Sequence, residues 1–217
     1  MSLTKLLSLI QTNKMFFSSM NILDDKREGF YRNIDIMGHL DNKEKDIQDF
    51  ISYDRSTTGH RNYVSCWFKA EYESLAMWDI YGRFNDSIAI QSDLNFFKKC
   101  IVDKRDWTLN IGPIKYVNWN SQNLFTPFNE KPNDDELFWY KDKSFQYEHE
   151  WRMIITLSEK EFNDMNKPKG LSIEVDTNSL IERIYLSQNY SSWSYDSIKN
   201  LLKDYGINSE IRKSRIS

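Results

Sequence analysis

The sequence predicts an α+β protein in which a mixed, mostly antiparallel sheet is flanked by helices. Runs typical of strands alternate with runs typical of helices from residue 62 onward. The 217 residues are 40% hydrophobic and 28% charged, which is the composition of one globular domain. Aromatic residues make up 15% of the chain and supply enough large apolar side chains for a core, which excludes a disordered protein.

The chain is expected to form a single domain over residues 1–217, because it carries no repeat, low-complexity tract or linker rich in Pro, Gly and Ser. Within it, residues 1–60 are expected to be helical and rich in loops. Apolar side chains recur at helix spacing at Leu3, Leu6, Leu7 and Ile10. Residues 15–19 are expected to form a short extended segment. Residues 21–46 are polar and contain many residues typical of turns, so they are expected to be rich in loops. A further helix is expected around the apolar stripe Ile47, Phe50 and Ile51.

Residues 61–217 are expected to form the sheet-containing body. Runs rich in β-branched and aromatic residues predict strands at 62–68, 87–91, 115–119, 150–157, 170–175, 184–187 and 207–211. One central sheet is expected to hold the first six of these strands. The two prolines and many Asn and Asp residues at 120–135 predict the longest loop.

Three helices are expected between these strands, and capping signals mark two of them. The expected helices cover residues 73–81, 92–102 and 194–205. Ser92 is the expected N-cap of the second, with Asp93 in its first turn. Gly206 is the expected C-cap of the third, whose buried face should hold Tyr195, Ile198, Leu202 and Tyr205.

Composition and motifs exclude several classes of protein. A net charge of -3 gives no overall basic field for nucleic acid. The 7 glycines fall into neither a dinucleotide fingerprint nor a phosphate-binding loop. Two cysteines and three histidines have no zinc-site spacing, so no metal is expected. No apolar run reaches the length that spans a bilayer, and no signal peptide is recognisable, so a cytoplasmic protein without a membrane partner is expected.

The segment KDKSFQYEHEWRM is the first candidate site. If it is extended, alternation places Tyr147, His149, Trp151, Met153 and Ile155 on one face, interpreted as core. Glu148, Glu150 and Arg152 then share the opposite face. Two carboxylates so close together need a compensating cation, and Arg152 is the expected one, with Lys141 or Lys143 behind it. Such a cluster is either a solvated ion ladder or a catalytic site.

The segment VSCWFKAEYESLAMWDIYG is the second candidate. Trp67, Trp78 and Tyr81 are interpreted either as core or as a pocket wall that stacks a base or a nicotinamide ring. Ser65 would supply a hydroxyl beside that pocket, and Cys66 is interpreted as a small buried hydrophobe. We therefore hypothesise a cleft in which Trp67, Trp78 or Tyr81 borders the carboxylate of Glu150.

These segments together resemble a widespread family of bacterial proteins catalogued as a domain of unknown function. The resemblance covers nearly the whole chain and rests on VSCW, MWDIY, SIAI, KYVNW, YKDKSFQYEHEWR, IYLS and RKSRI. Its specific pieces are Lys141 and the Glu-x-Glu-x-Arg motif of residues 148–152, whereas LDDKREG departs from the family's Asn-Asp-Pro turn. Members occur among genes of bacterial stress and phage defence, which implies such a role for this chain.

A weaker resemblance, to ADP-ribosyltransferases, concerns the order of elements and the Glu-x-Glu motif formed by Glu148 and Glu150. It implies an ADP-ribosyltransferase-like fold, NAD as the candidate cofactor, and a nucleotide or macromolecular target. In that chemistry a carboxylate stabilises an oxocarbenium-like transition state, so Glu150 would be catalytic, with Glu148, Arg152 and Lys141 in the site.

A non-catalytic binding or regulatory module that uses the same charged face is the alternative, and the absence of a His-Tyr-Thr strand ahead of the first helix favours it. An enzyme requires these charges to line a concave pocket with aromatic walls, whereas a module leaves them on an open face. A metal-dependent nuclease fits less well, because Trp151 and Arg152 follow the acidic pair where a lysine is usual.

Overall fold

The computed structural model describes residues 1–23, 60–82, 87–118, 138–166 and 168–216. The chain divides into two compact units. The first consists of Met1–Phe16, Ala70–Lys104 and Ser172–Ser217, and the second of Phe17–Lys69 and Arg105–Leu171. The helix expected around Phe50 and the loop expected at 120–135 lie outside the described residues. The expectation of one domain stays a prediction.

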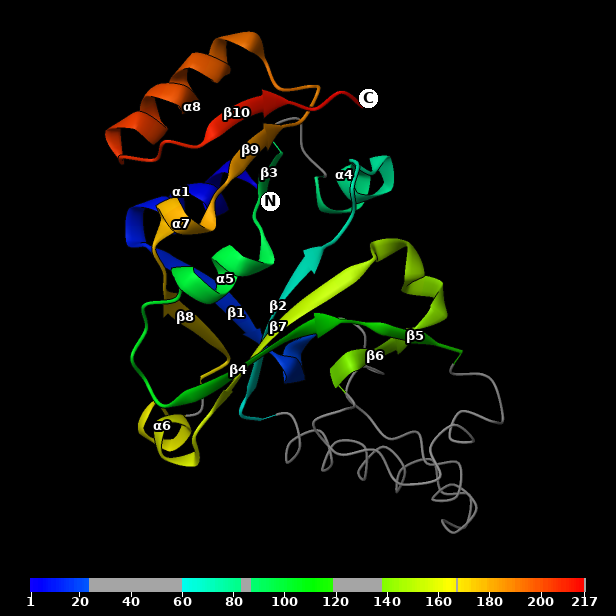
Figure 1. Cartoon of the computed structure of the whole chain (residues 1–217), viewed down its shortest axis with the longest axis vertical. Helices are drawn as coiled ribbons and strands as arrows, with labels where there is room; N and C mark the ends of the chain where they lie inside the picture. Colours follow the sequence, from blue (N-terminus) through cyan, green and yellow to red (C-terminus); the bar gives the residue numbers. More distant parts are fainter. Residues whose placement is uncertain (24–59, 83–86, 119–137, 167, 217) are drawn as a thin grey trace. The chain divides into compact units, whose positions relative to one another are not determined.

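The main sheet has five strands in the order β4-β7-β2-β1-β8 (Figure 1). Their bounds are Lys14–Ser19 (β1), Asn62–Phe68 (β2), Trp107–Pro113 (β4), Glu150–Leu157 (β7) and Gly170–Glu174 (β8). Strand β2 runs antiparallel to both β1 and β7, and β4 runs antiparallel to β7. The predicted α+β class with a mostly antiparallel sheet is therefore confirmed.

The expectation that one central sheet holds six of the predicted strands is wrong. Arg183–Leu186 (β9) lies between Ile88–Gln91 (β3) and Glu210–Lys213 (β10) in a three-stranded sheet. Lys115–Val117 (β5) pairs in parallel with Tyr140–Asp142 (β6) in a two-stranded one. Alternation of side chains identifies a strand but does not specify its partner, which is why the predicted strands were assigned to too few sheets.

Strand β4 was not predicted because its sequence, WTLNIGP, contains residues that weaken strands. It lies at one end of the five-strand order, and an edge strand tolerates a proline such as Pro113. Gly112 faces Arg152 across the β4–β7 pair, and a Cβ at this glycine would lie 3.2 Å from the ring of Trp139. The glycine therefore lets the Trp139 ring pack closely on this strand.

Helices in the first unit are Leu3–Thr12 (α1), Leu75–Tyr81 (α4), Leu94–Cys100 (α5), Thr177–Leu180 (α7) and Ser192–Asp204 (α8). Helix α1 buries Leu6, Leu9 and Ile10. The helix spacing in the sequence predicted Leu6 and Ile10 but not Leu9. The N-cap of α5 is Asp93, whose carboxylate accepts from Asn95 N at 2.7 Å, so the choice of Ser92 was wrong by one residue. A carboxylate caps a helix at least as well as a hydroxyl does, and sequence alone does not rank the two.

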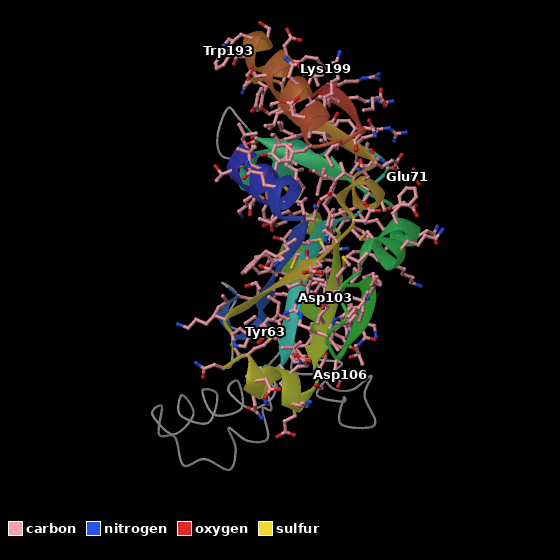
Figure 2. All side chains as sticks on the ribbon, turned by 90° about the vertical axis from the view of Figure 1, so that its left-hand side faces the viewer. Tyr63, Glu71, Asp103, Asp106, Trp193 and Lys199 are labelled. Atoms are coloured by element: carbon pink, nitrogen blue, oxygen red, sulfur yellow. The ribbon has the colours of Figure 1, made fainter. Side chains whose placement is uncertain are left out.

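Helix α8 ends at Asp204 and its C-cap is Tyr205, so the expectation of Gly206 as the C-cap was wrong by one residue. Gly206 follows the C-cap and adopts a left-handed φ of 70°. The Gly206 N–H donates to Lys203 O at 3.0 Å and the Ile207 N–H to Leu202 O at 2.8 Å, which is a Schellman motif. The buried face holds Ile198 and Leu202, whereas Tyr205 is 43% exposed, so the predicted face is only partly correct. Trp193 near the start of α8 is also exposed (Figure 2).

Replacing Gly206 by alanine should lower the free energy of unfolding by about 1 kcal/mol, because a Cβ is disfavoured at positive φ. Gly206→Asn should lower it less, since asparagine tolerates the left-handed region. Urea denaturation of the three proteins measures the difference. An alanine variant as stable as the wild type would show that the left-handed turn contributes nothing.

The second unit also contains Met20–Ile22 (η1), Lys143–Glu148 (η3) and Glu159–Asp164 (α6). One face of its β2–β7 pair carries a buried apolar cluster of Met20, Val64, Phe138 and Ile154, with Leu23 and Trp139 packed against it. No helix within the described ranges is long and apolar enough to cross a membrane. This apolar cluster shares its face of the sheet with the charged side chains of Glu150 and Arg152.

Candidate functional site

The segment that precedes β7 is a short helix, not the predicted strand. Residues Lys143–Glu148 form η3, which begins where the Asp142 carboxylate accepts from Ser144 N at 2.9 Å. His149 then adopts a left-handed φ of 40°, and strand β7 begins at Glu150. Tyr147 and His149 are exposed, so their assignment to the core is wrong. The side-chain bond from Asp142 favours a turn over extended backbone here.

The predicted alternation of side chains between the two faces of the sheet does hold from Glu150 onward. Met153 and Ile155 are buried on one face as predicted, but Trp151 is only half-buried, which contradicts its expected burial. The other face is also covered, because Glu150, Arg152 and Ile154 are buried. The predicted charged face is therefore neither an open ion ladder nor a solvated surface.

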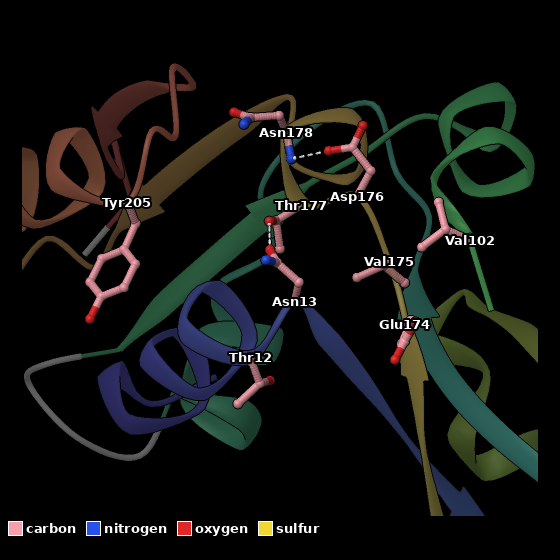
Figure 3. Close-up of a pocket in the computed structure, with 9 residues that line it drawn as sticks. All are labelled: Thr12, Asn13, Val102, Glu174, Val175, Asp176, Thr177, Asn178 and Tyr205. Carbon is pink, nitrogen blue, oxygen red and sulfur yellow. Dashed lines mark hydrogen bonds between the residues drawn. The ribbon is translucent and has the colours of Figure 1, made fainter.

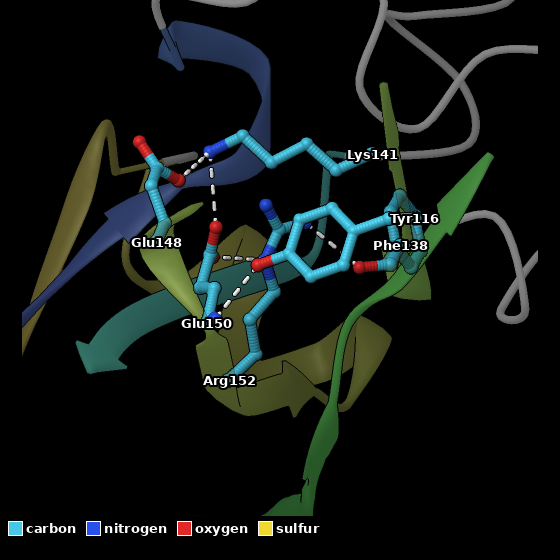
Figure 4. Close-up of polar contacts among 6 residues, drawn as sticks. All are labelled: Tyr116, Phe138, Lys141, Glu148, Glu150 and Arg152. Carbon is cyan, nitrogen blue, oxygen red and sulfur yellow. Dashed lines mark hydrogen bonds and ion pairs between the residues drawn. The ribbon is translucent and has the colours of Figure 1, made fainter. Parts of the chain in front are cut away.

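Lys141, Glu148, Glu150 and Arg152 form a charge cluster (Figure 4). Lys141 Nζ lies 2.5 Å from Glu148 Oε2 and 3.0 Å from Glu150 Oε2. Arg152 Nε donates to Glu150 Oε1 at 2.6 Å, and its Nη1 donates to Phe138 O at 2.8 Å. The predicted compensation of the two carboxylates by Arg152 and Lys141 is thus observed, although Glu148 reaches Lys141 from η3 and not from the strand.

The charge cluster is removed from water and electrically balanced. The side chain of Arg152 is 0% exposed, that of Glu150 5%, and that of Lys141 10%. Burial raises the pKa of Glu150, but the attraction and hydrogen bond of Arg152, with smaller contributions from Lys141 and Cys66, lower it to about 2. Glu150 is therefore ionised throughout the physiological pH range.

The main chain of Glu150 is held by the segment around β5. Ile114 N donates to Glu150 O at 2.9 Å, and Glu150 N donates to the hydroxyl oxygen of Tyr116 at 2.7 Å. Tyr116 is the register partner of Lys141 in the β5–β6 pair. Sequence reasoning missed Tyr116, because KYVNW carries no signal beyond that of an ordinary strand.

Cys66 lies opposite Arg152 in the β2–β7 register and is exposed, not buried as expected. Its side chain makes a hydrogen bond with Glu150 that contributes to the low pKa of that carboxylate. Alternation within VSCW places Cys66 on the face of β2 opposite to Trp67, but nothing in the sequence pairs it with Glu150.

Ser65 and Trp67 lie on the other face of the sheet from Glu150 and Arg152, because Trp67 pairs with Trp151. The indole N–H of Trp67 donates to Ser65 Oγ at 3.0 Å, and Lys69 Nζ lies 4.1 Å from the centre of the Trp151 ring. The structure therefore does not bring Ser65 and Trp67 together with the charge cluster.

Trp78 and Tyr81, the other predicted wall residues, lie on α4 in the first unit, whereas the charge cluster belongs to the second. The indole N–H of Trp78 donates to Glu73 Oε2 at 3.0 Å, and Tyr81 is 55% exposed. Their part in a binding site stays a prediction.

Among the residues that the structure describes, cavities are formed in the first unit at two places that no residue of the charge cluster lines. One, of about 380 Å³, lies among Thr12, Asn13, Glu174, Asp176 and Tyr205 (Figure 3). The other, of about 620 Å³, is lined by residues that include Phe96, Lys99 and Asn208. Within the part of the chain that the structure describes, no three His, Cys, Asp or Glu side chains are grouped so as to hold a metal ion.

Comparison with known proteins finds no family model, no curated protein and no solved structure that matches this chain. The candidate site therefore stands on its own geometry.

Proposed function

We propose that the chain is an ADP-ribosyltransferase-like enzyme of the bacterial stress- and phage-defence family that its motifs resemble, with Glu150 as the catalytic carboxylate. The observation that supports this function is the ionised carboxylate of Glu150, held 2.6 Å from Arg152 Nε and 3.0 Å from Lys141 Nζ. A carboxylate fixed in this way is suited to stabilise positive charge that develops on a substrate.

A pKa of about 2 excludes Glu150 as a proton donor at neutral pH and leaves it an electrostatic role. With NAD as the substrate, the bond between the anomeric carbon and the nicotinamide nitrogen breaks, and its electron pair leaves with the neutral nicotinamide. The anomeric carbon becomes cationic, and Glu150 stabilises that charge. A nucleophile on the nucleotide or macromolecular target then bonds to this carbon and releases its proton to water.

The exposure of the cluster indicates the side from which a ligand approaches Glu150. Arg152 is 0% exposed and acts as the fixed partner of the carboxylate from within the unit. Lys141 and Glu148 retain 10% and 7% exposure, and the exposed Cys66 also bonds to the carboxylate, so ligand contact with Glu150 involves displacing Lys141 or the Cys66 thiol. Glu148 can then keep the Lys141 ammonium as its partner.

A non-catalytic binding module is the second candidate, and the charge balance of the cluster favours it. Two carboxylates and two cations pair with one another, so the cluster has no net charge with which to attract a substrate cation. Such a buried network can instead specify the shape of a surface that a partner recognises.

Glu150→Gln tests the proposal. We expect nicotinamide release from NAD and transfer of labelled ADP-ribose to lysate protein or nucleic acid to fall roughly 100- to 1000-fold, as when an electrostatic contact to a transition state is lost. Glu210→Gln is the matched control, because Glu210 also pairs with an arginine, at 2.7 Å from Arg212, but is exposed and lies in the other unit. It should leave the rate unchanged.

Melting temperatures establish that each variant is folded. If Glu150→Gln fails to fold, Glu150→Asp replaces it as the test, since it keeps the negative charge among Arg152 and Lys141 but shortens the side chain that carries the carboxylate. A folded Glu150→Gln protein with the full transfer rate would contradict the catalytic proposal. Wild-type protein that neither turns over NAD nor melts higher in its presence would favour the binding module.

A further inference from the structure

Tyr116 contacts the first residue of β7 at its backbone. The hydroxyl oxygen of Tyr116 accepts the N–H of Glu150 at 2.7 Å, so a side chain takes the place of a ladder partner at this strand end. Burial raises the pKa of Tyr116, so its hydroxyl stays protonated at neutral pH. The contact is therefore a neutral hydrogen bond and not an ion pair.

Tyr116 and Lys141 act on Glu150 from the same two-stranded ladder. They are register partners in β5 and β6, and side chains at directly paired positions lie on the same face of a ladder. One reaches the backbone of Glu150 and the other its carboxylate (Figure 4). The ladder therefore holds Glu150 at two points.

The backbone of Glu150 needs such a restraint because it begins the strand. His149, the residue before it, has a left-handed φ of 40°, so η3 and β7 meet at a sharp change of direction. Ile114 N holds the carbonyl of Glu150 at 2.9 Å, and Tyr116 holds the N–H. The carbonyl of the same peptide accepts the Lys69 N–H at 3.1 Å, so loss of the Tyr116 bond leaves the peptide between residues 149 and 150 held on its carbonyl side only, and its plane can tilt and carry the Glu150 side chain with it.

We infer that Tyr116 is a positioning residue, which fixes the backbone of Glu150 so that the Glu150 carboxylate stays aligned with Arg152 for reaction. The inference rests on the proposed function for its catalytic consequence. Its structural part, the link from the Tyr116 hydroxyl to the orientation of the carboxylate, is measurable without any activity.

Tyr116→Phe removes the hydroxyl and keeps the ring. The Arg152 Nε–H proton reports on the carboxylate, because it donates to Glu150 Oε1 at 2.6 Å, and its NMR resonance should shift in the variant. Tyr63→Phe is the matched control: Tyr63 is fully buried in the same unit, its hydroxyl donates to Pro168 O at 2.8 Å, and it lies on the other sheet face. It should leave the Arg152 resonance in place.

In the transfer assay, Tyr116→Phe should lower kcat roughly 10- to 100-fold while KM stays within about twofold, because a displaced catalytic group costs rate more than binding. Tyr63→Phe should keep the wild-type kcat per folded molecule. An unshifted Arg152 resonance in folded Tyr116→Phe overturns the inference whatever the activity. A shifted resonance with an unchanged kcat also overturns the positioning role, whereas failure of the proposed function appears as wild-type turnover in Glu150→Gln.

Discussion

Replacing Arg152 by methionine is expected to lower the free energy of unfolding by about 3–5 kcal/mol, the usual cost of removing one partner from a buried ion pair. The side chain of Arg152 is fully buried, and its loss leaves the buried Glu150 carboxylate with Lys141 and the Cys66 side chain as its partners. The carbonyl of Phe138 also loses its donor. Urea denaturation at pH 7, followed by fluorescence and circular dichroism, measures the change.

Arg212→Met is the control for this prediction, because Arg212 also forms a short ion pair with a glutamate, at 2.7 Å from Glu210, but on the surface. It should leave the urea midpoint unchanged. Replacing all four members of the charge cluster by methionine should restore most of the stability that Arg152→Met loses, since no buried charge then remains unpaired. If Arg152→Met unfolds at the wild-type urea concentration, the cluster makes no contribution to stability.

Acid is expected to remove about 3 kcal/mol of stability through Glu150 alone, because its pKa of about 2 lies well below the ordinary value of 4.5. The unfolded chain binds the proton more readily than the folded one, so this stabilisation is complete above pH 4.5. It is lost progressively as the pH falls from about 4.5 toward 2.

The measurement compares the free energy of unfolding of wild type and Glu150→Gln at several pH values between 6 and 3. The wild type should lose stability more steeply below pH 4.5, because the variant has no carboxylate to protonate at this position. Parallel curves for the two proteins would show that Glu150 does not have a depressed pKa.

Local patterns predicted most of the elements correctly. Helix spacing identified α1 and α8, and alternation identified β2 and the part of β7 that begins at Glu150. These predictions succeeded because amphipathic periodicity reflects burial directly. Pairing between strands was not predictable, since β3 and β9 look no different from the strands of the main sheet until their partners are known.

The candidate site was predictable only in part. Charge balance identified the partners of the two carboxylates, because buried like charges require cations. The turn at His149 interrupts the alternation, and it was hidden because a non-glycine residue with positive φ has no clear sequence signal. Trp67 illustrates a further limit: alternation alone places it on the opposite face from Cys66, but the register with β7 is needed to relate it to Glu150.

The contrast between the two cysteines has a practical consequence for experiments. Cys66 is exposed and bonded to Glu150, whereas Cys100 is fully buried and burial raises the pKa of its thiol to about 11. Because the thiolate is the reactive form, a maleimide dye should attach to Cys66 in the folded protein and leave Cys100 unmodified. The natural sequence thus offers a single labelling position in contact with Glu150, from which fluorescence can follow events at that carboxylate without an engineered cysteine.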